Sequence, residues 1–249
     1  MRPLVTLLTD FGTADGYVGE IKGALFSRVP DVTIVDVTHD IPPQDVEAGR
    51  LALARVWRRF PPGTVHLAVV DPGVGSERGA LAVESDERAL VGPDNGVLSP
   101  ALLVSGARVV VLPIPPAAAP TFHGRDVFAP AAAELALGRP LDRLGAPAHD
   151  PIIRRTPEPH RLSDGAIHGE VISIDRFGNA ITNLVGLRNG VLEVNGMALP
   201  VRRTYADVAR GSLLAVVGSS GLIEIAVRDG NATDKLRLAR GDTVVFRPS

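Results

Sequence analysis

Three short segments of the sequence combine carboxylates with side chains that can donate or accept protons. They are residues 9–12 (TDFG), with Asp15 and Tyr17 following, residues 71–78 (DPGVGSER) and residues 121–126 (TFHGRD). A carboxylate, a guanidinium and an imidazole held together can orient water, move protons and bind a polar ligand. One Asp at the end of a strand is more often a turn or helix-cap residue. Three such segments in one chain therefore predict a polar binding or catalytic site.

The glycines of residues 71–78 are also typical of phosphate-binding loops, but the rest of the pattern is not. The segment lacks the lysine of the P-loop, and GVGSERG does not begin a convincing helix as a dinucleotide-binding GxGxxG does. The six histidines show no HxH, HxxxH or HExxH spacing, so we expect no metal site. His66 falls inside an expected strand, and His149 and His160 fall in an expected linker, where structural or solvated roles are typical.

Alternating strands and helices are expected to position the polar segments. Apolar runs predict strands and periodic segments predict helices: strands at 3–9, 32–37, 64–70, 80–84 and 107–114, and helices at about 15–29, 44–60 and 126–138. Asp45 is the expected N-cap of the second helix, and Gly138 the expected end of the third. This order predicts an α/β domain with a mainly parallel sheet. Ligands bind beyond the carboxyl ends of such strands, which is where the polar segments begin.

A second, smaller domain is expected after a segment of about residues 145–165 that is rich in proline and polar residues. The short apolar runs that follow are separated by Gly, Asn and Asp, which is typical of an all-β barrel or sandwich. They lie at residues 168–174, 181–185, 191–194, 213–217, 222–227 and 243–246. We therefore predict an N-terminal α/β domain over residues 1–148, a linker over 149–164 and a barrel-like C-terminal β domain over 165–249.

Composition narrows the class of protein further. The 249 residues are 45% hydrophobic and 22% charged with a formal net charge of −2, which is typical of globular domains. The absence of cysteine excludes disulfides, thiolate metal sites and a cysteine nucleophile, and favours the cytoplasm. The sequence contains no basic block, so we expect neither a nucleic-acid partner nor a membrane partner. We also expect no secretory signal and no transmembrane segment, because no apolar run approaches about 20 residues.

Six segments, taken in order, resemble the SAM hydroxide adenosyltransferases, the S-adenosylmethionine (SAM) hydrolases that are related to fluorinase and chlorinase. They are LLTDFGTADGYVGEIKGAL, DVTHDIPPQDVEAG, VVDPGVGSERGAL, VGPDNGVLS, TFHGRDVFAPAAA and IDRFGNAITNL. The resemblance runs from about residue 4 to the C-terminus. It implies an N-terminal α/β domain, a C-terminal β domain and a homotrimer that holds SAM between neighbouring subunits. SAM is then the substrate, and no cofactor is expected.

The resemblance also places the site residues. It implies a catalytic set of Asp71 in VVDPGVG, Arg78 in SERG and His123 in TFHGRD. It further implies a substrate-binding set in which Asp10 binds the ribose hydroxyls and the IDRFGN loop contacts the methionine amine and the adenine. This second set comprises Asp10, Phe11, Tyr17, Asp175, Phe177, Asn179, Ser219, Ser220, Glu224 and Val227. The halogenases have an Arg at the position of Ser220, and the spacing around VRDGNA departs from theirs, so only loosely defined adenine contacts are expected there.

Two positions distinguish hydrolysis from halogenation. The halogenases resemble this chain but have a Tyr at the position of Asp71, and fluorinase has a halide-binding Ser near Gly124. A carboxylate repels a halide in a poorly solvated pocket, whereas it accepts a hydrogen bond from water. We therefore expect in-line attack of water at the ribose C5′ of SAM to give adenosine and methionine, and the (R)-sulfonium epimer is a substrate attributed to this family.

Other interpretations remain open at the level of sequence. Arg78 should lower the pKa of Asp71 and weaken it as a base, which favours a role in orienting water. Asp71 and Arg78 could instead form a structural ion pair, and His123 could cap a helix start. At the level of the whole protein, the alternatives are a SAM-dependent halogenase and a non-catalytic protein that binds SAM or adenosine.

Overall fold

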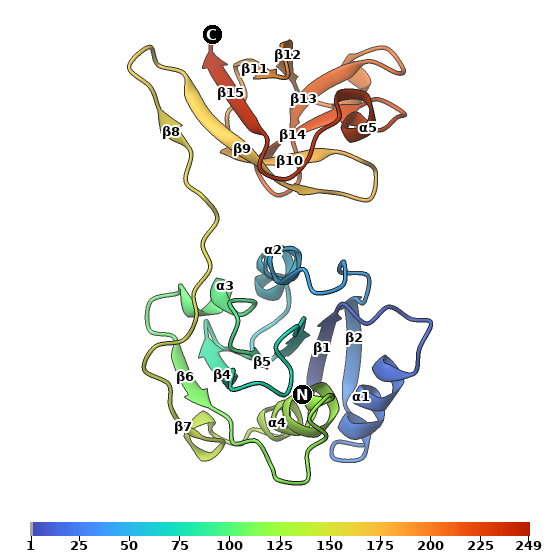
Figure 1. Cartoon of the computed structure of the whole chain (residues 1–249), viewed down its shortest axis with the longest axis vertical. Helices are drawn as coiled ribbons and strands as arrows, with labels where there is room; N and C mark the ends of the chain where they lie inside the picture. Colours follow the sequence, from blue (N-terminus) through green and yellow to red (C-terminus); the bar gives the residue numbers. More distant parts are fainter. Residues whose placement is uncertain (1) are drawn as a thin grey trace. The chain divides into compact units, whose positions relative to one another are not determined.

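The computed structural model describes residues 2–249, which form two compact units that divide between Arg155 and Thr156 (Figure 1). The first unit is a sheet with helices on both faces, and the second consists almost entirely of strands. The predicted fold class, an α/β domain followed by a β domain, is confirmed. No helix in residues 2–249 is long and apolar enough to span a bilayer.

The first unit has a seven-stranded sheet of order β2-β1-β3-β5-β4-β6-β7. Its strands are β1 (Leu4–Thr9), β2 (Thr33–Thr38), β3 (Val65–Val69), β4 (Ala80–Ser85), β5 (Arg88–Pro93), β6 (Arg108–Val111) and β7 (Ala146–Pro147). Strands β2, β1, β3 and β5 are parallel, whereas β4, β6 and β7 pair antiparallel. The direction changes at the tight β4–β5 hairpin, where Asp86 and Glu87 both have positive φ, as a two-residue type I′ turn requires.

Alternate residues of the central strands pack against different helices. Leu7 packs with helices α1 (Tyr17–Phe26) and α4 (Ala129–Ala136), whereas Leu8 packs with α2 (Val46–Val56), because successive side chains of a strand point to opposite faces. A short helix α3 (Ser99–Leu102) lies on the α2 side, and the minor helices are η1 (Trp57–Arg59), η2 (Gly124–Phe128) and η3 (Leu141–Arg143).

The ends of the predicted helices are determined by local residues. Asp45 is the N-cap of α2, and its carboxylate accepts a hydrogen bond from the Ala48 N–H at 3.0 Å, as predicted. Gly138 has a φ of 82° two residues after α4. Residues 124–128, within which the third helix was predicted to begin, form a π-helical turn instead. This turn directly follows His123 in the sequence.

The second unit is a closed barrel. Its sheet order is β10-β14-β13-β12-β11-β15-β9-β8, and β10 also pairs with β9. The elements are β8 (His160–Arg161), β9 (Ile167–Ile174), β10 (Ala180–Val185), β11 (Gly190–Val194), β12 (Met197–Arg202), η4 (Tyr205–Asp207), β13 (Leu213–Val217), β14 (Leu222–Val227), α5 (Ala232–Leu236) and β15 (Thr243–Pro248). Phe246 and Leu192 lie in its core. Strand β12 and helix α5 had no counterpart in the sequence prediction.

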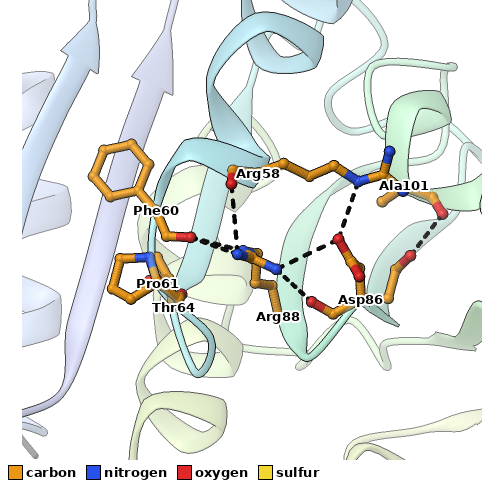
Figure 2. Close-up of polar contacts among 8 residues, drawn as sticks. Arg58, Phe60, Pro61, Thr64, Asp86, Arg88 and Ala101 are labelled. Carbon is orange, nitrogen blue, oxygen red and sulfur yellow. Dashed lines mark hydrogen bonds and ion pairs between the residues drawn. The ribbon is translucent and has the colours of Figure 1, made fainter.

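Arg88 holds the amino-terminal ends of β3 and β5 together, at the edge of the sheet opposite to the polar segments. Its Nε and Nη2 donate to the Phe60 carbonyl at 2.9 and 2.7 Å, and its Nη1 donates to the Asp86 carbonyl (Figure 2). A cavity of about 430 Å³ opens at this edge. The arginines that line it are paired with carboxylates, for example Arg108 with Glu84. This edge therefore has the features of a structural junction.

Candidate active site

Asp10 and Asp71 lie at the same edge of the first unit's sheet. Thr9, the last residue of β1, pairs with Val69, the last residue of β3, in parallel register. Asp10 directly follows the first of these strands and Asp71 closely follows the second. The sheet therefore brings the two carboxylates to its carboxyl-terminal edge, where the sequence analysis expected a ligand site.

Asp71 and Arg78 form a buried, two-pronged ion pair. Arg78 Nε donates to Asp71 Oδ1 at 2.9 Å, and Arg78 Nη2 donates to Asp71 Oδ2. The exposed fractions of the two side chains are only 6% for Asp71 and 9% for Arg78. Gly75 allows the intervening loop to pack closely, because a Cβ there would lie 2.6 Å from the Pro120 carbonyl oxygen. The same packing places Arg78 beside the segment that contains His123.

His123 completes the cluster through its Nδ1, which lies 3.0 Å from Arg78 Nη2. A guanidinium can only donate, so Nδ1 must be the acceptor and Nε2 carries the proton of the neutral ring. Burial, and then the positive charge of Arg78, lower the pKa of His123 below its ordinary value, although Asp71 and Asp126 oppose this shift. His123 precedes the π-helical turn, but its side chain makes no capping hydrogen bond, so helix capping does not explain its position.

Asn95 supports the catalytic candidates and was missed by the sequence analysis. Its Nδ2 donates to the Val70 carbonyl at 2.8 Å, next to Asp71, and its Oδ1 accepts from the Val97 N–H at 3.1 Å. Asn95 lies in the segment VGPDNGVLS, which was recognised only as part of the family pattern. No pattern in the sequence indicated that its amide fixes the end of β3.

Asp10 is held from outside its own loop. Its Oδ2 accepts a hydrogen bond at 2.7 Å from the backbone N–H of Gln44, a residue with a φ of 67°. Next to Asp10, the Phe11 ring lies 6.0 Å from both the Tyr17 and Phe122 rings, which are 5.4 Å apart, all edge-to-face. Phe122 adjoins His123 in the sequence, so this aromatic cluster extends from the Asp10 loop to the catalytic candidates.

The remaining candidates belong to the second unit and fall into two groups. In the first, Asp175 closes the loop between β9 and β10: its Oδ1 accepts from the N–H groups of Phe177 and Asn179 at 2.9 Å each, and its Oδ2 accepts from Asn179 Nδ2 at 2.9 Å. Asn179 is buried, whereas the Phe177 side chain projects from this loop with 74% of its surface exposed.

The second group lies around β14 and the turn that precedes it. Glu224 is buried, and its Oε2 accepts a hydrogen bond from the Tyr205 hydroxyl at 3.0 Å. Gly218 gives this carboxylate room, since a Cβ there would lie 1.7 Å from Glu224 Oε1. Val227 is buried at the end of β14. The other two candidates, Ser219 and Ser220, are exposed in the turn between β13 and β14.

Other polar groups of the first unit serve as structural contacts. His66 is fully buried in β3, and its Nδ1 lies 2.8 Å from Thr6 Oγ1, in agreement with the structural role predicted for it. Within residues 2–249, no group of three or more His, Cys, Asp or Glu side chains is placed to hold a metal ion.

Fold and site together define a two-unit protein in which a parallel sheet edge carries a buried carboxylate–guanidinium–imidazole cluster. The sequence matches the SAM hydroxide adenosyltransferase N-terminal domain over residues 5–145 and the C-terminal domain over residues 169–245. The chain belongs to the SAM hydroxide adenosyltransferase family.

Relatives and solved structures agree with this assignment. The chain is 45% identical to the (R)-S-adenosyl-L-methionine hydrolase of Thermus thermophilus over 97% of this chain and 98% of that one. It is 30% identical to a fluorinase of an Actinoplanes species over 90% and 91%. A crystal structure of an uncharacterized conserved protein from Thermotoga maritima is similar with a TM-score of 0.89 and 33% identity, covering 97% of this chain and 99% of that one.

Proposed function

We propose that this protein hydrolyses SAM to adenosine and L-methionine. The contacts that Arg78 makes with both Asp71 and His123 at the sheet edge are the observation that carries the proposal. In the reaction, a water oxygen bonds to C5′ while the C5′–S bond breaks. The bonding electrons pass to sulfur, the sulfonium becomes the thioether of methionine, and the attacking oxygen releases one proton to bulk water. Holding that water in line with the C–S bond lowers the barrier by several kcal/mol, with an oxygen about 3 Å from the carbon.

Asp71 orients the water in this mechanism. Both of its oxygens already accept hydrogen bonds from Arg78, but a carboxylate oxygen has a second lone pair that can accept one from water. The guanidinium fixes the plane of the carboxylate. His123 contributes a neutral ring whose Nε2–H is a donor at the same cluster. A negative charge at Asp71 disfavours a halide in the same place, which favours hydrolysis over the halogenase alternative.

The reaction requires no cofactor in this proposal, since SAM itself carries the leaving group. The substrate-binding set of the sequence analysis is retained, with Asp10 assigned to the ribose hydroxyls. Support for Asp10 comes from its position beside Asp71 and from the Gln44 N–H that holds one of its oxygens.

The central test is adenosine release from SAM by the Asp71→Asn variant. Asparagine keeps the size of the side chain but removes the charge, so we expect kcat to fall about 10²- to 10⁴-fold. The exposed Asp31→Asn variant is the matched control and should keep wild-type turnover. Full turnover by Asp71→Asn would remove this residue from the mechanism. Reaction in ¹⁸O-water should label the 5′-hydroxyl of adenosine, and 5′-halo-adenosine formed with added halide would instead support the halogenase.

We further propose that the (R)-sulfonium epimer of SAM is the preferred substrate, because the hydrolases that resemble this chain over nearly its full length carry that name. The test is to measure kcat/KM on the separated epimers. A higher value for the (S)-epimer would contradict the assignment. Tight binding of adenosine without turnover of either epimer would support the non-catalytic alternative.

We also propose a compartment and an oligomeric state for this protein. The family resemblance supports a cytoplasmic homotrimer, and the absence of cysteine from the sequence fits a reducing compartment. Light scattering coupled to gel filtration should give about three times the 26.1 kDa chain mass. A monomer that is fully active would contradict the trimer.

A further inference from the structure

His39 connects two strands behind the Asp10 loop. It directly follows β2, and only 5% of its side-chain surface is exposed. Its Nδ1 lies 2.9 Å from Thr9 Oγ1, at the end of β1, and its Nε2 lies 3.1 Å from Asp36 Oδ1. The other oxygen of Asp36 accepts from Lys22 Nζ at 2.7 Å. A continuous polar chain therefore runs from helix α1 through β2 to the residue that precedes Asp10.

The donor and the acceptor of each contact between Lys22 and Thr9 can be assigned from the carboxylate of Asp36. Burial opposes ionisation of Asp36, but the contacts with Lys22 and His39 hold its pKa below the ordinary value. An ionised carboxylate attracts a protonated nitrogen, so the Asp36 oxygen at ion-pair distance favours a proton on His39 Nε2. In the tautomer that is protonated at Nε2 alone, Nδ1 accepts a hydrogen bond from the Thr9 hydroxyl. This leaves the lone pairs of Thr9 Oγ1 free to accept.

The same histidine fixes both sides of Asp10. Thr9 Oγ1 accepts a hydrogen bond from the Phe11 N–H at 3.3 Å, and the His39 carbonyl accepts one from the Gly12 N–H at 2.8 Å. Asp10 lies between these anchored residues, and the contact of its own Oδ2 with Gln44 fixes one carboxylate oxygen. His39 makes no contact with Asp71, Arg78 or His123 in the described hydrogen bonds, so the water-attack cluster is held independently.

We propose that His39, oriented by Asp36 and acting through Thr9, is a positioning residue that aims the Asp10 carboxylate at the ribose hydroxyls of the substrate. The inference rests on the role of Asp10 in the proposed function. Loss of the Thr9 contact should weaken ribose recognition while the attack of water at C5′ is largely preserved. The effect should therefore appear in KM and in the discrimination between ribose and deoxyribose ligands, and much less in kcat.

Two amide variants separate the two nitrogens of the ring. His39→Gln places an amide near Nε2 and keeps the Asp36 contact but loses Thr9, whereas His39→Asn places one near Nδ1 and keeps Thr9. We expect His39→Gln to raise KM for SAM about tenfold and to change kcat less than about threefold, and His39→Asn to recover most of the loss. Thr9→Val, which removes the hydroxyl at constant shape, should reproduce the Gln effect. The exposed His149→Gln variant is the matched control.

Calorimetry with adenosine and 2′-deoxyadenosine tests the inference without requiring turnover. Wild type should bind adenosine more tightly, and the affinity ratio should fall towards one in Asp10→Ala, His39→Gln and Thr9→Val. An unchanged ratio in both His39→Gln and Thr9→Val, with the ratio lost in Asp10→Ala, would overturn the positioning role alone. No discrimination by wild type would overturn the ribose role of Asp10 and the inference with it. Normal discrimination without SAM hydrolysis would contradict only the proposed function.

Discussion

Arg78 is the residue on which the geometry of the catalytic candidates depends. It donates to both oxygens of Asp71, to the Nδ1 of His123 and to the Gly79 carbonyl, and its guanidinium lies 5.1 Å from the centre of the Phe128 ring. One planar, permanently charged group thus fixes the plane of a carboxylate and the tautomer of an imidazole. The contacts of Arg78 with Asp71 and His123 bring together three residue types that the sequence offered as one set, whereas the direction of these hydrogen bonds could not be predicted from the sequence.

Replacement of Arg78 by lysine should test this geometry. A lysine ammonium is a point donor and cannot bridge both Asp71 oxygens and His123 at once, so we expect kcat to fall about 10²-fold despite the conserved charge. The exposed Arg59→Lys variant serves as control. Single-turnover rates should show the loss directly. Retained turnover in Arg78→Lys would mean that charge alone, and not the planar fork, is what the site needs.

The pH dependence of kcat/KM should reveal a neutral His123. Burial and the charge of Arg78 lower its pKa below the ordinary 6.5, so the ring takes up its proton at a lower pH than a free imidazole does. The midpoint of the acidic decline in activity should lie below pH 6.5, because protonation turns Nδ1 into a donor facing Arg78. His123→Asn keeps an acceptor for Arg78 but cannot titrate in this range. A midpoint at or above pH 6.5, or an unchanged decline in the variant, would contradict this assignment.

At the scale of elements, the turn after β5 determines where β3 ends. Asn95 reaches from that turn to the carbonyl of Val70, which is fully buried, so loss of its amide leaves an unsatisfied acceptor beside Asp71. We expect Asn95→Asp to destabilise the fold by about 1–3 kcal/mol and to lower kcat about tenfold. Urea unfolding and initial rates measure the two effects. The exposed Asn189→Asp variant should change neither, and wild-type values in Asn95→Asp would show that β3 holds Asp71 unaided.

Strands with a continuous or alternating pattern of apolar residues could be predicted from the sequence. Features that depend on contacts between residues far apart in the sequence could not. The strands that end at Asp10 and Asp71 follow from uninterrupted apolar runs. Strand β5 was missed because RALVGP begins with a charged residue and ends in Gly-Pro, and its hairpin turn contains no glycine. The contacts of His39 and Asn95 join residues 30 and 25 positions apart, which local propensity cannot reveal.

In the second unit, the clearest prediction concerns Gly218, which directly follows β13. An alanine Cβ would collide with Glu224 Oε1, so the carboxylate must move and its contact with Tyr205 is lost. We expect Gly218→Ala to destabilise the protein by about 1–3 kcal/mol and to raise KM for SAM. Gly19→Ala in α1 has open space around its Cβ and should be neutral or slightly stabilising. Thermal unfolding compares them, and equal stability would show that Glu224 relocates without cost.

At the scale of the whole molecule, a buried histidine makes the first unit sensitive to acid. Burial, and then the charge of Arg88, lower the pKa of His66 from 6.5 to about 4. Between these pH values the unfolded chain binds a proton at His66 that the folded chain does not bind. The free energy of unfolding is therefore highest above pH 6.5 and decreases as the pH falls towards 4. The free energy of unfolding should therefore drop by about 2 kcal/mol between pH 7 and pH 5.

Fluorescence of Trp57 can measure this drop for the first unit alone. Trp57 is the single tryptophan of the chain and its ring lies 6.5 Å from His66, whereas the second unit has none. Because Asp and Glu titrate mainly below pH 5, few other groups contribute between pH 7 and pH 5. His123, with its own lowered pKa, adds to the slope in the same direction.

The His66→Asn variant should be less stable at pH 7 but lose distinctly less stability on acidification, whereas the exposed His149→Asn control should follow wild type. Equal pH slopes for wild type and His66→Asn would assign the acid sensitivity to other groups, and the buried ring would then be neutral without being the cause.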